Sequence, residues 1–226
     1  MKVLKETEKI KVIKLEIIIT NTYHVTNTYI IIDKETNSGI IIDPADKAEY
    51  IQEILGQEKI KLKKIILTHA HADHMGAVKE LLNKNKDVNV YVHELDKDIN
   101  NERINEQDKV YMRLEKIPEE RIITLKDGEI IQENNISLEV IHTPGHTKGA
   151  IVLLDKENNI LYSGDTIFHN TYGRTDLYHS DKLNMKETLD NLFNRFEDIE
   201  VYPGHDDTFN IKDTKRKIQL LFAYKG

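Results

Sequence analysis

Three histidines and one aspartate occur within six residues, as His69, His71, Asp73 and His74. An apolar run at 65–67 precedes them, and a helical pattern follows. Imidazoles at positions 69, 71 and 74 cannot all lie on one face of a strand or of a helix, so we expect a loop here. A loop at a strand end can fold its side chains around a point, and a metal ion is the expected occupant of that point. A polar turn with solvated histidines is the alternative interpretation.

His146, Asp165 and His205 repeat this arrangement farther along the chain, because each follows a strand-like run that ends in a glycine. The glycine lets the backbone turn sharply directly before the candidate ligand. All three residues therefore leave a strand at the same kind of place as the histidine cluster. This recurrence predicts that the candidate ligands meet at one edge of a β-sheet.

The composition limits which metal sites and partners are compatible with the chain. It has 226 residues, and we interpret 1–226 as a single domain with a sizeable core. The formal net charge of −7 argues against a nucleic-acid partner, which would favour a basic surface. There is no cysteine, which excludes disulfides, thiolate ligands and a cysteine nucleophile. Any metal must therefore be held by imidazole and carboxylate groups, which suit zinc, iron or manganese.

The first residues are charged and lack the apolar core of a signal peptide, and no stretch reaches the length needed to span a bilayer. We therefore expect a cytoplasmic protein. We also expect it to act on a small molecule and to have no membrane or nucleic-acid partner.

Short strands and amphipathic helices must position the candidate ligands. Three strands with tight turns suggest an antiparallel meander, and the alternation of strand and helix after it indicates a layered sheet covered by helices. The pair Asp43-Pro44 reads as a helix N-cap followed by proline at the first helical position. The expected strands span 10–20, 28–33, 40–42, 62–67, 88–92, 121–125, 129–132, 136–141, 150–154, 160–162 and 199–202, and the expected helices 44–56, 76–82, 183–196 and 211–222.

Residues 94–120 are charged and irregularly apolar. We interpret them as a helical insertion made of one or two exposed helices. A lid over the site, or the surface of a homodimer, is the alternative.

The motifs of this chain resemble those of the metallo-β-lactamase fold superfamily. In chain order they are His69-x-His71-x-Asp73-His74, Thr143-Pro144-Gly145-His146-Thr147, Ser163-Gly164-Asp165-Thr166 and Pro203-Gly204-His205. The last three are similar to those of the glyoxalase II-like (hydroxyacylglutathione hydrolase-like) branch, and Gly173-Arg174-Thr175-Asp176-Leu177 is similar to a motif of the short members of that branch. The resemblance spans about residues 15–210.

The resemblance implies an α/β fold, the αββα sandwich, in which two mixed β-sheets are flanked by helices. It also implies two divalent metal ions at one edge of the sandwich, zinc being favoured and iron or manganese being alternatives. The implied ligands are His69, His71 and His146 for the first ion, Asp73, His74 and His205 for the second, and Asp165 as a bridge between them. Asp73 and Asp165 would act in catalysis by positioning a hydroxide shared by the two ions.

A loop that follows Asp165 carries the expected substrate contacts, His169, Tyr172 and Arg174. Arg174 stands where we would place the lysine with which the glyoxalase II branch grips glutathione. The remaining histidines are expected not to be ligands. His142 is interpreted as a packed or hydrogen-bonded strand residue, His93 and His179 as non-ligands, and His24 as a surface-turn residue or, alternatively, a contact at the rim of the site.

The function implied by the resemblance is a dinuclear metal-dependent hydrolase that cleaves a small thioester such as a hydroxyacyl-glutathione. A hydroxide bridging the ions would attack the carbonyl carbon. Another hydrolase of this fold, acting on a lactone, phosphodiester, RNA or β-lactam, is the alternative, and a persulfide dioxygenase would need only one iron. A metal sensor without turnover is a further alternative, although seven ligands for two ions leave coordination positions open for water.

Overall fold

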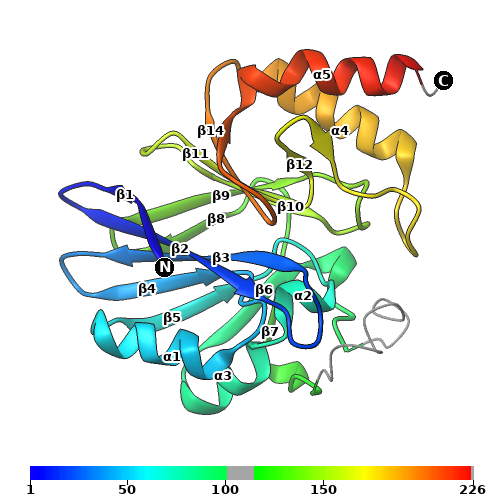
Figure 1. Cartoon of the computed structure of the whole chain (residues 1–226). Helices are drawn as coiled ribbons and strands as arrows, with labels where there is room; N and C mark the ends of the chain where they lie inside the picture. Colours follow the sequence, from blue (N-terminus) through cyan, green and yellow to red (C-terminus); the bar gives the residue numbers. More distant parts are fainter. Residues whose placement is uncertain (101–114, 225–226) are drawn as a thin grey trace.

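Two mixed β-sheets pack face to face, with helices on both outer faces, in the computed structural model (Figure 1). The structure describes residues 1–100 and 115–224. This arrangement confirms the αββα sandwich expected from the sequence. Among the described helices, none is both long and apolar enough to cross a membrane.

The first sheet consists of β1 (Lys2–Glu6), β2 (Ile10–Ile18), β3 (Val25–Asp33), β4 (Ser38–Ile42), β5 (Lys61–Ile66), β6 (Asn89–His93) and β7 (Ile122–Leu125), in that order. The second consists, from edge to edge, of β15 (Phe209–Asn210), β14 (Glu200–Pro203), β11 (Ile160–Gly164), β10 (Ile151–Asp155), β9 (Ile136–His142) and β8 (Ile130–Glu133). A separate hairpin pairs β12 (Ile167–Phe168) with β13 (Thr171–Tyr172). The helices are α1 (Ala48–Gln57), α2 (Ala72–Met75), α3 (Val78–Lys84), α4 (Lys182–Arg195) and α5 (Ile211–Tyr224).

Strand direction explains how distant parts of the chain meet. In the first sheet β4, β5 and β6 are parallel neighbours. In the second sheet β11 is parallel to β14, and β9 shares their direction because both β9 and β11 pair antiparallel with β10. The C-terminal ends of these strands therefore lie at one edge of each sheet, where loops can bring their side chains together.

Aliphatic side chains and three tyrosines fill the space between the sheets. The ring of Tyr29 in β3 lies 5.4 Å from that of Tyr162 and 5.6 Å from that of Tyr202, measured between centroids. The Tyr29 hydroxyl donates a hydrogen bond to the carbonyl oxygen of Pro203, with the oxygens 2.7 Å apart. This bond joins the first sheet to the segment that carries His205.

The strand and helix pattern expected from the sequence is confirmed over most of the chain, with two differences at the start. The edge strand β1 was not predicted, because a half-exposed edge strand gives little alternation of burial. The assignment of Asp43 as a helix N-cap was wrong. Helix α1 begins at Ala48, and Lys47, in the left-handed conformation, precedes it. Asp43 is buried, and its carboxylate is used elsewhere.

The helical insertion predicted for 94–120 falls mainly on residues 101–114, which lie outside the described residues. At its two ends the chain forms single 3₁₀ turns, Glu94–Asp96 and Glu119–Arg121. Asn100 closes the base of the segment, because its side chain exchanges two hydrogen bonds with the backbone of Ile117, of 2.8 and 2.9 Å.

The tyrosine cluster provides a test of how the two sheets are joined. Tyr29→Phe removes the hydrogen bond to Pro203 and should lower the free energy of unfolding by about 1–2 kcal/mol. Tyr162→Phe is the matched control, because its buried hydroxyl has no hydrogen-bond partner among the described residues. We expect that change to be neutral or stabilising. Urea unfolding of the metal-free protein measures both, and equal losses in the two variants would contradict the assignment.

Candidate metal centre

All seven predicted ligands lie just beyond strand ends and form one cluster in the structure. His69, His71, Asp73 and His74 follow β5, His146 follows β9, Asp165 follows β11 and His205 follows β14. The expected loop is correct for 69–71, but residues 72–75 form the single helical turn α2. On that turn Asp73 and His74 are adjacent residues whose ligand atoms lie close together, with Asp73 Oδ2 3.7 Å from His74 Nε2.

The ligand atoms fall into three groups, within each of which they lie at most 4.8 Å apart. The groups are His69 with His71 and His146, His69 with His74 and Asp165, and Asp73 with His74 and His205. The first and third groups coincide with the two ligand sets implied by the resemblance. Asp165 adjoins both sets, since its carboxylate lies 3.3 Å from His74 and His205 and 3.5 Å from His146. Its bridging role stays a prediction, and this position is compatible with it.

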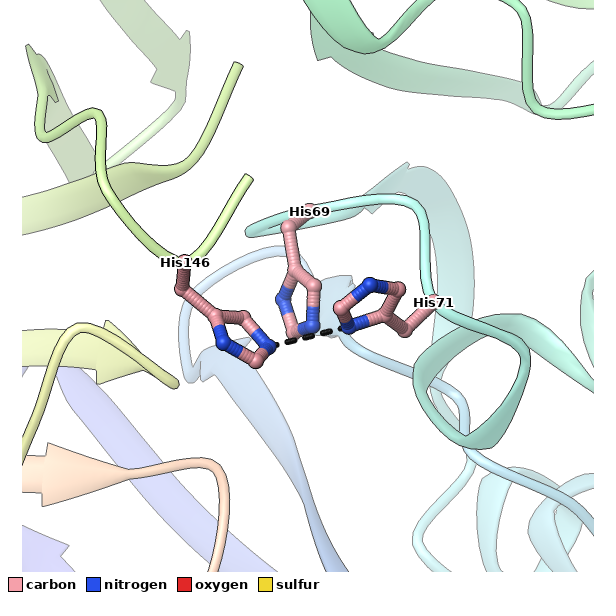
Figure 2. Close-up of side chains that lie close together, drawn as sticks. All are labelled: His69, His71 and His146. Atoms are coloured by element: carbon pink, nitrogen blue, oxygen red, sulfur yellow. Dashed lines mark hydrogen bonds between the residues drawn. The ribbon is translucent and has the colours of Figure 1, made fainter. Parts of the chain in front are cut away.

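Figure 2 shows that His69 and His71 approach from one loop and that His146 approaches from another. The Nε2 atom of His146 lies 2.9 Å from Nδ1 of His71. His71 therefore presents Nδ1 to the cluster, whereas His146 presents Nε2.

Four of the imidazoles are held in place through Nδ1. The partners of Nδ1 are Thr68 Oγ1 at 3.1 Å for His69, Asp43 Oδ2 at 2.9 Å for His74, the Arg174 carbonyl at 2.9 Å for His146 and the Val25 carbonyl at 2.6 Å for His205. An imidazole that donates through Nδ1 has its free electron pair on Nε2. These contacts therefore fix the ring orientation and the tautomer that a metal ligand requires.

Asp43 is a site residue that the sequence analysis misassigned. It is 2% exposed, and its carboxylate accepts hydrogen bonds from the backbone nitrogen and hydroxyl of Thr68, both of 2.7 Å, and from His74. The Thr68 hydroxyl also contacts His69, so one carboxylate orients two ligands. Its position directly after a buried strand, like that of the other site residues, was the available signal.

Three buried atoms of the cluster have no hydrogen-bond partner among the described residues: His69 Nε2, His74 Nε2 and Asp165 Oδ1. Leaving a buried polar atom unpaired costs about 1–3 kcal/mol. Coordination to a cation would satisfy these atoms, and a donor set of imidazole and carboxylate suits divalent zinc, iron or manganese. The residues present therefore fit a divalent metal centre.

The protonation of the cluster depends on which side chains face each other. Burial, together with the neighbouring His146, lowers the pKa of His71 to about 3. Burial also acts to lower the pKa of His74, but the carboxylates of Asp165, Asp73 and Asp43 outweigh it and raise that pKa to about 10. For His205 the same balance, dominated by Asp165, raises the pKa to about 12. Without a metal, positive charge on His74 and His205 therefore compensates the carboxylates.

The predicted substrate residues lie on the loop after Asp165 but make other contacts. The His169 ring stacks on Phe209 at 5.6 Å, and the Tyr172 ring stacks on Phe222 at 4.6 Å. The Arg174 guanidinium forms two hydrogen bonds of 3.0 Å with Asp176, while its carbonyl holds His146. Their contact with a substrate stays a prediction.

The remaining histidines lie outside the three ligand groups. His142 is half-buried and donates from Nε2 to the Lys148 carbonyl at 2.8 Å. Its ring stacks on that of His93 at 4.2 Å. The ring of His179 contacts Tyr178 at 3.9 Å, and His24 is exposed.

A cavity of about 570 Å³ opens beside His205, one of the predicted ligands. Three carboxylates are among its polar groups, and His24 also lines it. The full lining is Glu16, Tyr23, His24, Val25, Asn27, His205, Asp206 and Asp207. The position of His24 there matches the alternative that we considered for it, a residue at the rim of the site.

Comparison with known proteins agrees with this geometry. A model of the metallo-beta-lactamase superfamily matches residues 21–205. The chain is 30% identical over 199 residues to the hydroxyacylglutathione hydrolase GloC of Haemophilus influenzae, covering 86% of this chain and 92% of that protein. Two solved structures share its fold with a TM-score of 0.77. They are the BLEG-1 B3 metallo-beta-lactamase, at 25% identity with 89% and 95% coverage of the two chains, and TTHA1623 in a di-iron-bound form, at 26% with 91% and 99%.

The role of Asp43 can be tested by metal affinity. Asp43→Asn places an amide nitrogen against Thr68 or His74, both of which donate to this carboxylate, and should weaken metal binding by about 10–100-fold. Asp46→Asn is the matched control. It lies in the same connection, but its carboxylate accepts from Thr20 rather than from the ligand network. Competition with a chromophoric chelator measures both affinities, and similar values for the two variants would contradict the role.

Metal binding should release protons, because a coordinated imidazole must be neutral. With pKa values of about 10 and 12, His74 and His205 carry protons at pH 7.5 before metal binds. We therefore expect about two protons released per chain and an affinity that rises as the pH increases. Calorimetry in buffers of different ionisation enthalpy counts these protons. His205→Ala should release about one proton fewer, and an enthalpy independent of the buffer would refute this prediction.

Proposed function

The chain belongs to the metallo-beta-lactamase superfamily, and on this premise we propose that it is a dinuclear hydrolase of small thioesters, such as a hydroxyacyl-glutathione. The observation that carries the proposal is the convergence of five imidazoles and two carboxylates, with buried unpaired atoms, at one edge of the sandwich. The choice of thioester is supported by the similarity to GloC over nearly its whole length.

Each of the two proposed ions would have its own set of ligands. His69, His71 and His146 would hold the first, and Asp73, His74 and His205 the second, with Asp165 touching both sets. The two ions would supply a lowered pKa for water and a Lewis acid for the carbonyl oxygen of the substrate. We propose zinc as the native metal, with iron and manganese as the alternatives.

Two carboxylates, Asp73 and Asp165, would orient the attacking water. Asp73 Oδ2 accepts a hydrogen bond of 3.3 Å from Thr26 in β3 and lies 3.4 Å from His205 Nε2. Asp165 is held against three imidazoles and is largely buried. Burial acts to raise the pKa of Asp165, but the neighbouring His205 and His74 outweigh it and hold this pKa well below its usual value. The pKa of Asp73 is lowered as well, so both carboxylates are ionised and can accept a hydrogen bond from water.

We propose that the thiol part of the ester lies in the cavity beside His205. This cavity is contiguous with the metal ligands through His205. Lys14 already pairs with the cavity carboxylates Glu16 and Asp207, and Arg174 pairs with Asp176, so neither of these two cations is free to bind the carboxylates of glutathione. Discrimination between glutathione and simpler thiols should therefore be weak. We further propose that the protein is cytoplasmic and forms a homodimer. Its partner would be a small-molecule substrate, with no nucleic acid or membrane.

The proposal predicts metal-dependent hydrolysis of lactoyl-glutathione, with at most about a tenfold advantage in kcat/KM over the same acyl group on a truncated thiol. Asp165→Ala should lower kcat by about a hundredfold or more and loosen both ions, because both sets lose their shared contact. The assay compares thioesters with a lactone, a phosphodiester and a β-lactam at a known metal content.

His142→Ala serves as the control, because His142 lies outside the ligand groups. The substitution removes a hydrogen bond and a ring contact and should lower mainly the stability of the protein. Equal metal loss in both variants would show that the ligand set is misassigned. Faster turnover of the lactone, phosphodiester or β-lactam than of every thioester would replace the proposed substrate class.

A further inference from the structure

The loop between β9 and β10 carries His146 and is fastened to the second half of the fold. The backbone nitrogen of Asp181 donates to the Gly145 carbonyl at 2.7 Å. The hydroxyl of Thr188 in α4 donates to the Pro144 carbonyl at 2.7 Å. These bonds hold the residues before His146 but leave open how the residues after it are fixed.

Asp96 fixes the other side of this loop. It ends the 3₁₀ turn after β6 and so belongs to the first half of the fold. Its carboxylate is 5% exposed and accepts hydrogen bonds from the Thr147 hydroxyl at 2.6 Å and from the Gly149 backbone nitrogen at 2.8 Å. Both donors lie within three residues of His146. A buried carboxylate is therefore satisfied by the loop that presents a metal ligand.

Gly149 shows how closely the two segments approach. A Cβ atom at position 149 would lie 2.6 Å from the Asp96 backbone nitrogen and 2.7 Å from its Cγ. Only glycine lets the loop pass near enough to donate its backbone nitrogen to this carboxylate. The contact therefore depends both on glycine at position 149 and on the burial of Asp96.

The position of this contact matters because the first ligand set is assembled from two halves of the molecule. His69 and His71 come from the loop after β5, and β5 pairs directly with β6, which leads to Asp96. His146 comes from the loop after β9 in the second sheet. Figure 2 shows it approaching from a different loop than His69 and His71. Asp96 joins these two halves next to His146, together with the backbone hydrogen bond from Ile151 to Thr68. Metal sites need their ligands placed to within about 0.5 Å, so such a link can set the affinity for an ion.

We propose that Asp96 is a positioning residue that, through Thr147 and Gly149, places His146 and so sets the affinity of the first ion. This inference rests on the dinuclear centre of the proposed function but not on its substrate. It predicts an effect confined to the ion held by His69, His71 and His146. A merely structural anchor would weaken both ions alike or neither.

The experiment measures zinc binding in two backgrounds by competition with a chromophoric chelator. In His205→Ala the first ligand set stays complete, and in His71→Ala the second does. Thr147→Val removes the hydroxyl donor to Asp96, whereas Thr147→Ser keeps it. We expect Thr147→Val to weaken zinc by about tenfold in the His205→Ala background and by less than about twofold in the His71→Ala background. Thr147→Ser should match the parent protein in both.

Asp96→Asn is the second variant, and Asp155→Asn is its matched control. Asp155 is also a buried aspartate that closes a turn, through Asn158, but it lies at the opposite end of β10 from the site. Asp96→Asn should show the same selective loss as Thr147→Val, and Asp155→Asn should leave both affinities unchanged even if the protein melts at a lower temperature.

Equal losses in the two backgrounds, or Thr147→Val binding zinc as tightly as Thr147→Ser, would overturn the inference. Binding of fewer than two ions by the parent protein would instead refute the dinuclear centre and the inference with it. Failure to hydrolyse thioesters would refute the substrate class alone, because zinc binding is measured without substrate.

Discussion

The structure depends on holding five imidazoles and two carboxylates close together with their potential ligand atoms facing one another. Such a cluster is unfavourable on its own, since buried polar atoms that lack partners cost free energy and like groups repel. It persists because four of the five rings are restrained through Nδ1, by a carboxylate, a hydroxyl or a backbone carbonyl. The restraints are made before any ion arrives, so binding an ion does not have to include the cost of ordering the side chains.

The sandwich supplies the rigidity that these restraints need. Strands of one direction end at the same edge in each sheet, and packing between the sheets fixes the two edges relative to each other. Three ligands come from short loops after β9, β11 and β14, while four come from a single segment after β5. Loops on a rigid support can vary in sequence without moving their anchors, which is why such an edge can serve different reactions.

The fold and the clustering of the seven candidate ligands could be predicted because the relevant signals are local. A buried strand followed by glycine and a histidine or aspartate can be recognised without knowledge of the partner. The supporting residues could not be found this way. Asp43 was taken for a helix cap because its local pattern fits one, and only the tertiary position of Thr68 and His74 shows its role. Arg174 was selected for its side chain, whereas the structure uses its carbonyl to hold His146.

Asp43 follows β4, and Asp96 lies in the turn after β6. These two strands flank β5, which leads into the histidine segment 69–74. Asp43 acts within its own half, through Thr68 and His74. Asp96 acts across to the other half, through Thr147 and Gly149. Because a carboxylate accepts several hydrogen bonds at once, a single buried acid can fix two groups relative to each other. Two such acids flanking β5 therefore hold both the segment that provides most of the ligands and the loop that completes the first set.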